Sequence, residues 1–328
     1  MASEILVTGA SGFTGWHLTR RLVEAGRQVR VLTRATSRRE HLEPLGVEFA
    51  QGDLCDTGSL NRAVLGIDTV YHIAAGYRDG SLTDADLDRV NAAGTLNLLD
   101  AADRAGVRRL VHCSTIGVHG NIRVPPAREE TDLAPGDGYQ RSKLRGERAA
   151  AGYHSSRGIE IAIFRPCAIY GPGDLRFLKL FRAIARRRFV MLGRGRALYH
   201  MVFIDDLVDG ILLCGSEPGA VGQTFILGGE AWTDLNQLVG TVAAILGVPR
   251  PVLHLPFAPA YALATLCEGV CRPLGIDPPL YRRRVDFFRK NRAFDISRAR
   301  QRLGYRPRVG LHEGLKRTAD WYVQAGLL

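Results

Sequence analysis

Lysine is the residue type that this chain most lacks. Among 328 residues, 44 are basic, but only four of these are lysines: Lys143, Lys179, Lys290 and Lys316. A lysine kept in such a composition is expected to serve a task that a planar guanidinium serves poorly. The first of the four lies in the stretch DGYQRSKLRGE, four residues after Tyr139.

Long hydrophobic runs are missing as well. No segment approaches the roughly 18–20 uninterrupted apolar residues of a membrane span. The opening residues, MASEILVTGA, have neither the basic segment nor the long apolar segment of a secretory signal, so we expect a cytoplasmic protein. The composition, 46% hydrophobic and 23% charged, is that of a globular chain long enough for one large domain or two closely joined ones.

Cysteine clusters and basic stripes are also absent. The six cysteines are scattered, and no His or Cys pair near Cys267 and Cys271 completes a zinc set, so we expect reduced thiols and no metal. The net charge of +11 is spread along the chain, apart from arginine runs at 186–188 and 282–284, and no aromatic residues interleave with it. This pattern excludes nucleic acid as the expected partner and favours an anionic ligand or an anionic membrane surface.

What the sequence does contain is an alternation of strand-like and helix-like segments. Helical spacing covers residues 15–25 and 82–105, and a glycine follows each as a helix cap. Strand patterns alternate with these helices, which predicts an α/β fold with a doubly wound parallel sheet. The expected strands lie at residues 4–9, 28–34, 47–53, 68–75, 108–115 and 159–166. We expect residues 1–170 to form this domain, with later sheet elements near 200–228, and 171–328 to form mainly an interleaved substrate lobe.

A glycine motif, VTGASGFTG, follows the first strand and opens the first helix. A diphosphate needs backbone N–H groups at close range and gains from the positive end of a helix dipole. The position of the motif therefore predicts a Rossmann-type dinucleotide site. The residues expected at the cofactor in this region are Gly9, Ser11, Gly12, Phe13, Thr14 and Gly15, with Ala74 and Ala75 after the fourth strand.

The residues that follow the next two strands are expected to bind the adenosine half of the cofactor. The second strand ends in Arg34, with Arg38 and Arg39 behind it, where a site selective for NAD usually has an acid. A guanidinium suits a 2′-phosphate, so the sequence favours NADP over NAD, the alternative being that these arginines only face solvent. After the third strand, Asp53 is placed to accept from the adenine amino group, and Leu54 to lie against the ring.

Tyr139 and Lys143 are four residues apart in a helical segment and therefore share one face. A phenol with a pKa near 10 acts as an acid or base at neutral pH only if a nearby cation favours its ionised form. A lysine one turn away supplies that charge, and its compact ammonium can donate to both ribose hydroxyls. At the end of the fifth strand, a hydroxyl of Ser114 or Thr115 can hold a substrate oxygen beside Tyr139.

Five motifs in order, TGASGFTG, GDLCD, STIGVHG, YQRSK and RPCAIYGPGD, resemble the extended short-chain dehydrogenase/reductase family, also called the epimerase/dehydratase family. The resemblance covers nearly the whole chain. It implies that Tyr139 and Lys143 are catalytic together with Thr115, which lies five residues before Gly120. It also implies an Asn91 relay, Pro166 and Ile169 near the nicotinamide, and a homodimer formed by helices near 82–105 and 139–156.

Three activities share this machinery. Sugar dehydratases of the family carry acids just after the catalytic threonine, whereas this chain has Ile116 and Gly117, which cannot drive elimination. Nucleotide-sugar 4-epimerases resemble the chain over YGPGD and HMVFIDDLVDGI, but the arginine that grips their diphosphate is displaced here to Arg194 or Arg196. Such an epimerase remains the alternative hypothesis. A redox-sensing binding protein without catalysis is disfavoured, because the chain keeps both Tyr139 and Lys143.

The C-terminal half is similar to the branch of 3β-hydroxysteroid dehydrogenases and dihydroflavonol 4-reductases. An apolar helix at 261–271 either roofs a pocket for a bulky hydrophobic alcohol or ketone, or only packs on the sheet. The amphipathic stretch 175–189 offers a possible contact with a membrane surface. The main hypothesis is an oxidoreductase that prefers NADP(H) and moves a hydride between the nicotinamide and a hydrophobic secondary alcohol or ketone.

Overall fold

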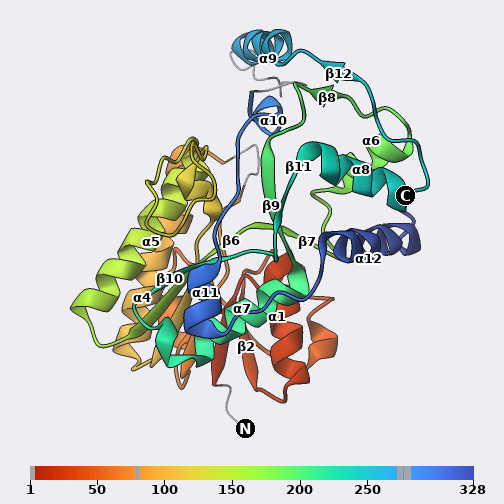
Figure 1. Cartoon of the computed structure of the whole chain (residues 1–328). Coiled ribbons are helices and arrows are strands. Elements are labelled where there is room, and N and C mark those ends of the chain that lie inside the picture. The colour runs from red at the N-terminus through yellow and green to blue at the C-terminus, as the bar shows by residue number, and fades with distance from the viewer. Residues whose placement is uncertain (1–3, 78–81, 272–275, 277–281) are drawn as a thin grey trace.

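The computed structural model describes residues 4–77, 82–271, 276 and 282–328. A seven-stranded parallel sheet lies at its centre, in the order β10-β6-β5-β4-β1-β2-β3 (Figure 1). This order confirms the predicted Rossmann-type α/β fold. The strands are β1 (Ile5–Thr8), β2 (Val29–Thr33), β3 (Glu48–Gln51), β4 (Thr69–His72), β5 (Arg109–Cys113), β6 (Glu160–Pro166) and β10 (Thr224–Leu227).

Helices cover both faces of the sheet because successive strand side chains point to opposite sides. Leu6 of β1 packs into a core with the helices α2, α4 and α5, while its neighbours Ile5 and Val7 pack into a second core with α1 and α7. The helices around the sheet are α1 (Phe13–Glu24), α2 (Thr57–Ala63), α3 (Asp84–Asp88), α4 (Gly94–Arg104), α5 (Gly138–Ser156), α7 (Ile204–Ser216) and α11 (Ser297–Leu303).

A second lobe rises above the carboxyl ends of the strands (Figure 1). Its strands form two small sheets, β11-β9-β7 and β12-β8. The lobe comprises β7 (Ala168–Tyr170), α6 (Leu178–Ala185), β8 (Met191–Leu192), β9 (Leu198–Phe203), β11 (Trp232–Asp234), α8 (Leu235–Ile245), β12 (His254–Leu255), α9 (Phe257–Cys271), α10 (Arg282–Asp286) and α12 (Leu311–Gln324). Of the later elements near 200–228, only β10 joins the main sheet, and β9 belongs to this lobe.

Two sequence-based expectations about helices change in the structure. The helix expected at 82–105 is interrupted by a π-helical turn at Arg89–Ala93, between α3 and α4. The amphipathic stretch around α6 buries its apolar side chains Leu178, Phe181 and Ile184 in the protein core, so this helix has no apolar face to offer a membrane. No helix in the described part of the chain is long and apolar enough to span a bilayer.

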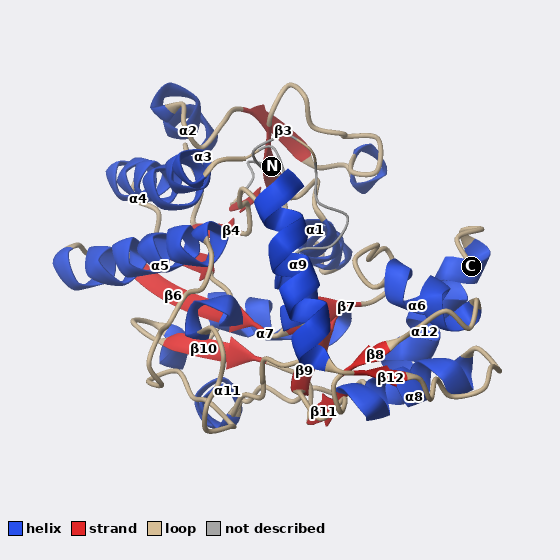
Figure 2. Ribbon diagram, turned by 90° about the horizontal axis from the view of Figure 1, so that it is seen from above, coloured by secondary structure: helices blue, strands red, loops and turns tan. Residues whose placement is uncertain are grey.

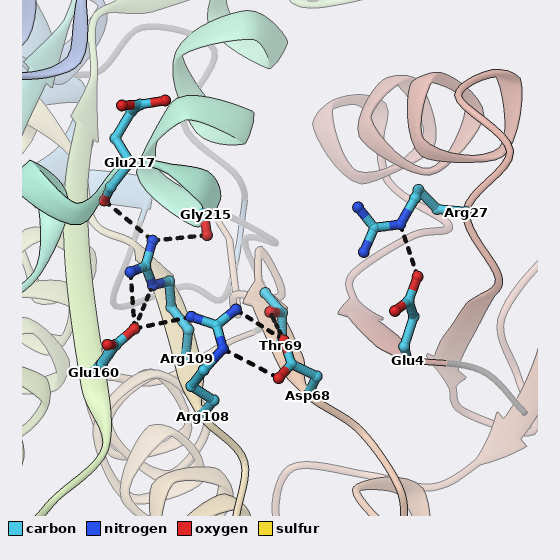
Figure 3. Close-up of polar contacts among 9 residues, drawn as sticks. All are labelled: Glu4, Arg27, Asp68, Thr69, Arg108, Arg109, Glu160, Gly215 and Glu217. Atoms are coloured by element: carbon cyan, nitrogen blue, oxygen red, sulfur yellow. Dashed lines mark hydrogen bonds and ion pairs between the residues drawn. The ribbon is translucent and has the colours of Figure 1, made fainter.

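Ion pairs join elements at the amino ends of the strands (Figure 3). Arg109, only 4% exposed, donates to the carbonyls of Gly215 and Glu217, at 2.8 and 3.1 Å, where α7 ends. Arg109 and Arg108 both pair with Glu160 of β6. Cationic groups at a helix C-terminus satisfy its last carbonyls, so this edge of the sheet is tied together by side chains while the opposite edge carries the cleft described below.

His72 anchors a hydrogen-bond chain beneath that opposite edge. Thr8 Oγ1 lies 2.8 Å from His72 Nδ1, and Thr95 Oγ1 lies 3.0 Å from His72 Nε2. Because the Thr95 hydroxyl donates to the Asn91 carbonyl at 2.8 Å, Nε2 carries the ring proton and Nδ1 accepts from Thr8. Burial, with a smaller contribution from Lys143, lowers the pKa of His72 to about 3. The imidazole is therefore neutral at physiological pH.

This neutral histidine predicts a loss of stability in mild acid. An unfolded His72 takes up a proton below a pKa of about 6.5, whereas the folded ring stays neutral until about pH 3, so the stability contribution falls as the pH falls through that window. Between pH 7 and pH 5 this costs about 2 kcal/mol. A His72→Gln variant can keep both hydrogen bonds and has no such proton. Urea unfolding at the two pH values is expected to show a loss about 2 kcal/mol smaller for the variant, and equal losses would contradict the assignment.

Candidate functional site

A cleft of about 1310 Å³ lies between the carboxyl ends of the central strands and the second lobe. Ligands of doubly wound sheets bind at this edge. Its walls include every site residue predicted from the sequence except Asn91: Gly9, Ser11, Gly12, Phe13, Thr14, Gly15, Arg34, Asp53, Leu54, Ala74, Ala75, Ser114, Thr115, Tyr139, Lys143, Pro166 and Ile169. The fold thus brings motifs from six strand ends to one place.

The glycine loop forms one end of the cleft. Gly9 has φ +76°, and a Cβ there would lie 2.6 Å from the Ala74 nitrogen. A Cβ at Gly15 would lie 2.1 Å from the Gly9 carbonyl oxygen, so the helix can approach the strand only with glycine at this position. The N-cap of α1 is Gly12, which has no side chain to occupy the first N–H groups of the helix. This arrangement is a cradle for a diphosphate.

The adenosine end of the cleft is built by the loops after β2 and β3. Arg34 is exposed, and its backbone N–H donates to the Ser37 hydroxyl at 3.1 Å; both residues line the cleft. Arg39 instead lies over the Phe49 ring, and among the described residues it is not part of the cleft wall. Only Arg34 of the three arginines, together with Ser37, therefore lies in the described cleft wall. The sequence reasoning missed Ser37, which the turn after β2 brings back toward the site.

Asp53 and Leu54 complete this end. One oxygen of Asp53, Oδ1, accepts from the Cys55 N–H at 2.8 Å, which leaves the second oxygen for another donor. The Leu54 side chain is 6% exposed and belongs to the core on the α2 and α4 side. Both residues lie in the cleft wall, with a carboxylate and an apolar surface next to each other, and their contact with an adenine stays a prediction.

Tyr139 and Lys143 come from the first two turns of α5, which Asp137 caps by accepting from the Gln140 N–H at 2.8 Å. The Tyr139 ring is half-buried and meets the Tyr77 ring edge to face at 5.0 Å. Lys143 is only 1% exposed, although its side chain lines the cleft. Burial lowers the pKa of Lys143, and Cys113 and Glu147 oppose that shift. The site therefore holds a phenol next to a largely desolvated ammonium.

The two hydroxyl residues after β5 have different surroundings. Thr115 Oγ1 accepts from the Gly117 N–H at 3.1 Å, which leaves the hydroxyl proton free to be donated into the cleft. Ser114 is 2% exposed, and its hydroxyl donates to Glu147 at 2.5 Å. Thr115 is thus the hydroxyl available to a substrate oxygen, whereas that of Ser114 is committed to a buried carboxylate.

Sequence reasoning missed the network to which Glu147 belongs. Arg165 donates to Glu147 through Nε, at 3.0 Å, and through Nη2, at 2.5 Å, and both side chains are nearly inaccessible. Arg165 also donates to His119 Nε2 at 2.9 Å, and burial together with Arg165 lowers the pKa of His119 to about 4. A signal was present, because Glu147 follows Lys143 by one helical turn and Arg165 directly precedes Pro166. The network fixes the strand ends around the ammonium.

Asn91 lies beneath the cleft. It is 1% exposed and within the π-helical turn. Its amide oxygen accepts from the Gly76 N–H at 2.7 Å, and its amide nitrogen donates to the Gly76 carbonyl and to the Ser142 hydroxyl, each at 2.9 Å. These bonds use both amide protons, so in this structure the side chain ties the loop after β4 to α5. A π-helical turn at such a place is typical of functional sites.

The second lobe lines the other half of the cleft with aromatic and apolar side chains. Tyr199 meets Phe177 and Phe287 edge to face, at 6.4 and 5.3 Å. The guanidinium of Arg292 lies over the Tyr199 ring at 5.8 Å. At the boundary with the glycine loop, Arg176 donates to the Ile169 carbonyl at 2.9 Å and lies over the Phe13 ring. The sequence pointed to this half only through its apolar character, without naming these residues.

Comparison with known proteins agrees with this geometry. Residues 5–228 match the model of the NAD dependent epimerase/dehydratase family. The chain is 32% identical to sterol demethylase protein B of Methylococcus capsulatus, over 98% of this chain and 99% of that protein. It is 31% identical to 3beta-hydroxysteroid-dehydrogenase/decarboxylase isoform 1 of Arabidopsis thaliana, over 96% of this chain and 78% of that protein. The solved structure of gox2253 is 30% identical, superposes with a TM-score of 0.85 and covers 100% of both chains.

The match over residues 5–228 is more than half of the chain, and the relatives align over nearly all of it. The resemblance inferred from the five motifs is confirmed. The chain is an enzyme that belongs to the NAD-dependent epimerase/dehydratase family, the extended short-chain dehydrogenases/reductases.

Proposed function

We propose that this enzyme is an NADP(H)-preferring oxidoreductase that interconverts a bulky hydrophobic secondary alcohol and its ketone. The observation that carries the proposal is the pairing of Tyr139 with the buried Lys143 in the wall of a cleft whose opposite half is aromatic. A phenol and an ammonium one helical turn apart are suited to proton transfer at an oxygen atom.

The residues of the cleft fit a dinucleotide. A side chain at Gly9 or Gly15 would clash with backbone atoms, and the open N-terminus of α1 suits a diphosphate. When bound there, the nicotinamide would supply a hydride to the carbonyl carbon or accept one from the carbinol carbon. The Lys143 ammonium would donate to the ribose hydroxyls, and Pro166 and Ile169 would border the ring.

The remaining chemistry is assigned to two side chains. Tyr139 gives its phenolic proton to the ketone oxygen during reduction, or takes the hydroxyl proton during oxidation. Thr115 donates its free hydroxyl proton to the same oxygen and so orients the reacting carbon. Lys143 favours the phenolate because its charge lies in a site from which water is largely removed, and a low local dielectric strengthens that effect.

Two observations support a hydrophobic substrate. The second lobe presents Phe177, Tyr199 and Phe287 to the cleft, and two ion pairs of this half, Glu268 with Arg282 and Asp286 with Lys290, each at 2.7 Å, compensate charges in its wall. The relative from Methylococcus capsulatus is described as a sterol demethylase protein, and that from Arabidopsis thaliana as a steroid dehydrogenase.

The alternative function, a nucleotide-sugar 4-epimerase, requires side chains that bind a second diphosphate. The two arginines that the sequence suggested for that role, Arg194 and Arg196, are not in the described wall of this cleft, where the basic residues of the second half are Arg176, Arg282, Lys290 and Arg292.

The role of Tyr139 is tested by Tyr139→Phe. The phenylalanine ring keeps the contact with Tyr77, so fold and cofactor binding are expected to be unchanged, while turnover falls by about 10²–10⁴-fold because the proton donor is lost. Substrates are first found with a panel of steroids, flavonoids and UDP-sugars, each with NAD and NADP. Lys143→Arg is the matched variant, since it keeps the charge but loses the compact ammonium, and it should weaken both cofactor binding and turnover. Undiminished turnover in Tyr139→Phe would exclude the mechanism.

The cofactor preference is tested at Arg34. Replacing Arg34 with leucine removes a charged donor for the 2′-phosphate, so the affinity for NADPH should fall by roughly 10–100-fold while that for NADH changes little. Arg38→Leu is the control, because Arg38 is absent from the described cleft wall. Cofactor fluorescence titration measures both affinities. An equal loss for the two cofactors, or a wild-type enzyme that binds NADH more tightly, would contradict the preference.

A further inference from the structure

Apart from the buried Glu268, helix α9 carries no charged residue, and its two opposite sides have different surroundings. Tyr261, Ala264 and Glu268 recur at helical spacing on its inner side, where Tyr261 and Glu268 line the cleft and Ala264 is fully buried. Leu263, Leu266 and Val270 recur with the same spacing on the outer side and are 58%, 65% and 52% exposed. A helix that is apolar all round is normally covered on every side. The outer side of α9 is not covered by the described chain.

The exposed side chains of α9 are part of a larger patch. Fourteen large hydrophobic side chains are exposed in the described residues, and seven of them lie between 252 and 276. We call these seven the apical patch: Val252, Leu253, Leu255, Leu263, Leu266, Val270 and Ile276. Figure 1 shows α9 and β12 at the end of the molecule opposite the N-terminus, and Figure 2, seen from above, shows α9 lying across that end. A concentration of this kind marks an interaction surface.

Positive charge borders the apical patch at the start of α9. A pocket of about 340 Å³ at the start of α9 is lined by Arg194, Arg196 and Arg289, next to Phe257. Only Arg289 has a carboxylate partner among the described residues, Asp286 at 2.8 Å. The chain has no acidic residue between Asp174 and Asp205, where eight basic residues lie, and none between Asp234 and Glu268. The partner of this surface must therefore be both apolar and anionic.

We propose that the apical patch docks on an anionic lipid bilayer, with the outer side of α9 in the boundary between head groups and acyl chains. The apolar side chains would enter that boundary, and Arg194 and Arg196 would contact lipid phosphates. A second copy of the chain fits less well, because an isologous interface would bring two positively charged copies of the same surface together. The patch is wholly aliphatic, whereas the cores of protein interfaces are enriched in aromatic residues.

Docking in this way gives α9 two roles. Its inner side lines the aromatic half of the cleft, and its outer side would contact lipid, so one helix would separate the substrate half of the cleft from the bilayer. The docking itself rests on the exposed residues and charges and not on the identity of the substrate. It is therefore testable without any turnover assay.

The test is flotation of the full chain with vesicles of phosphatidylcholine alone or of phosphatidylcholine with phosphatidylglycerol. We expect flotation with the anionic vesicles that weakens as salt is raised. The double variant Leu263→Glu, Leu266→Glu should lose it. The matched control is Leu65→Glu, Val323→Glu, which adds the same charge at side chains that are 62% and 59% exposed but lie outside the apical patch, and it should float nearly as well as the wild type. Arg194→Ala and Arg196→Ala should each weaken binding about fivefold.

Circular dichroism and thermal unfolding establish that each variant is folded. Four outcomes would overturn the proposal. The first is a wild type that fails to float with anionic vesicles. The second is a Leu263→Glu, Leu266→Glu variant that floats as the wild type does. The third is flotation at the wild-type level by both arginine variants. The fourth is a wild-type dimer, seen by light scattering, that does not bind vesicles and that the leucine substitutions convert to a monomer. This result would assign the patch to a second copy of the chain.

Discussion

The burial of the Lys143 ammonium is the constraint on which the rest of the site depends. Lys143 is 1% exposed, and burying its charge costs free energy unless the surrounding groups compensate the lost hydration. The two histidines whose pKa values Lys143 helps to lower are neutral, since burial holds the pKa of His72 at about 3 and that of His112 well below its usual value. Both ring nitrogens of His112 lack a hydrogen-bond partner among the described residues, so this ring behaves as an apolar neighbour. The remaining nearby acid, Glu147, is held by Arg165.

The two edges of the sheet have different roles: one is held together by side-chain contacts, and the other carries the cleft. At the amino edge, Arg108 and Arg109 join β4, β5, β6 and the end of α7 through ion pairs and carbonyl contacts. At the carboxyl edge, the first N–H groups of α1 and the hydroxyl proton of Thr115 have no such partner among the described residues. Binding groups can stay available at one edge because the other supplies rigidity. In the proposed docking, a third surface, the outer side of α9 on the second lobe, contacts lipid.

Sequence reasoning captured the features that depend on local geometry. Gly9 and Gly15 are required by close backbone approach, and Tyr139 and Lys143 share a face because helices repeat every 3.6 residues. The two residues of each pair lie within a few positions of each other in the chain, so a short sequence motif identifies them. The doubly wound parallel sheet was predicted from the alternation of strands and helices.

Features that depend on tertiary contacts were not accessible in this way. The commitment of the Ser114 hydroxyl to Glu147 joins residues 33 positions apart, and the role of Asn91 depends on its contacts with Gly76 and Ser142. The helical pattern at 175–189 has the amphipathicity of a membrane-surface helix, but the same pattern suits a helix that packs on a core, and α6 does so. The apolar helix at 257–271, in contrast, proved to be exposed on one side.

The central claim is that Lys143 stabilises the ionised form of Tyr139. The most direct measurement is the ultraviolet difference absorbance of phenolate, recorded during a pH titration of the cofactor-bound wild type and of a variant in which Tyr139 is phenylalanine. The account predicts one equivalent of phenolate that forms at a pH below the ordinary phenol pKa near 10 and is missing from the variant. Identical titration curves for the two proteins below that pH would contradict it.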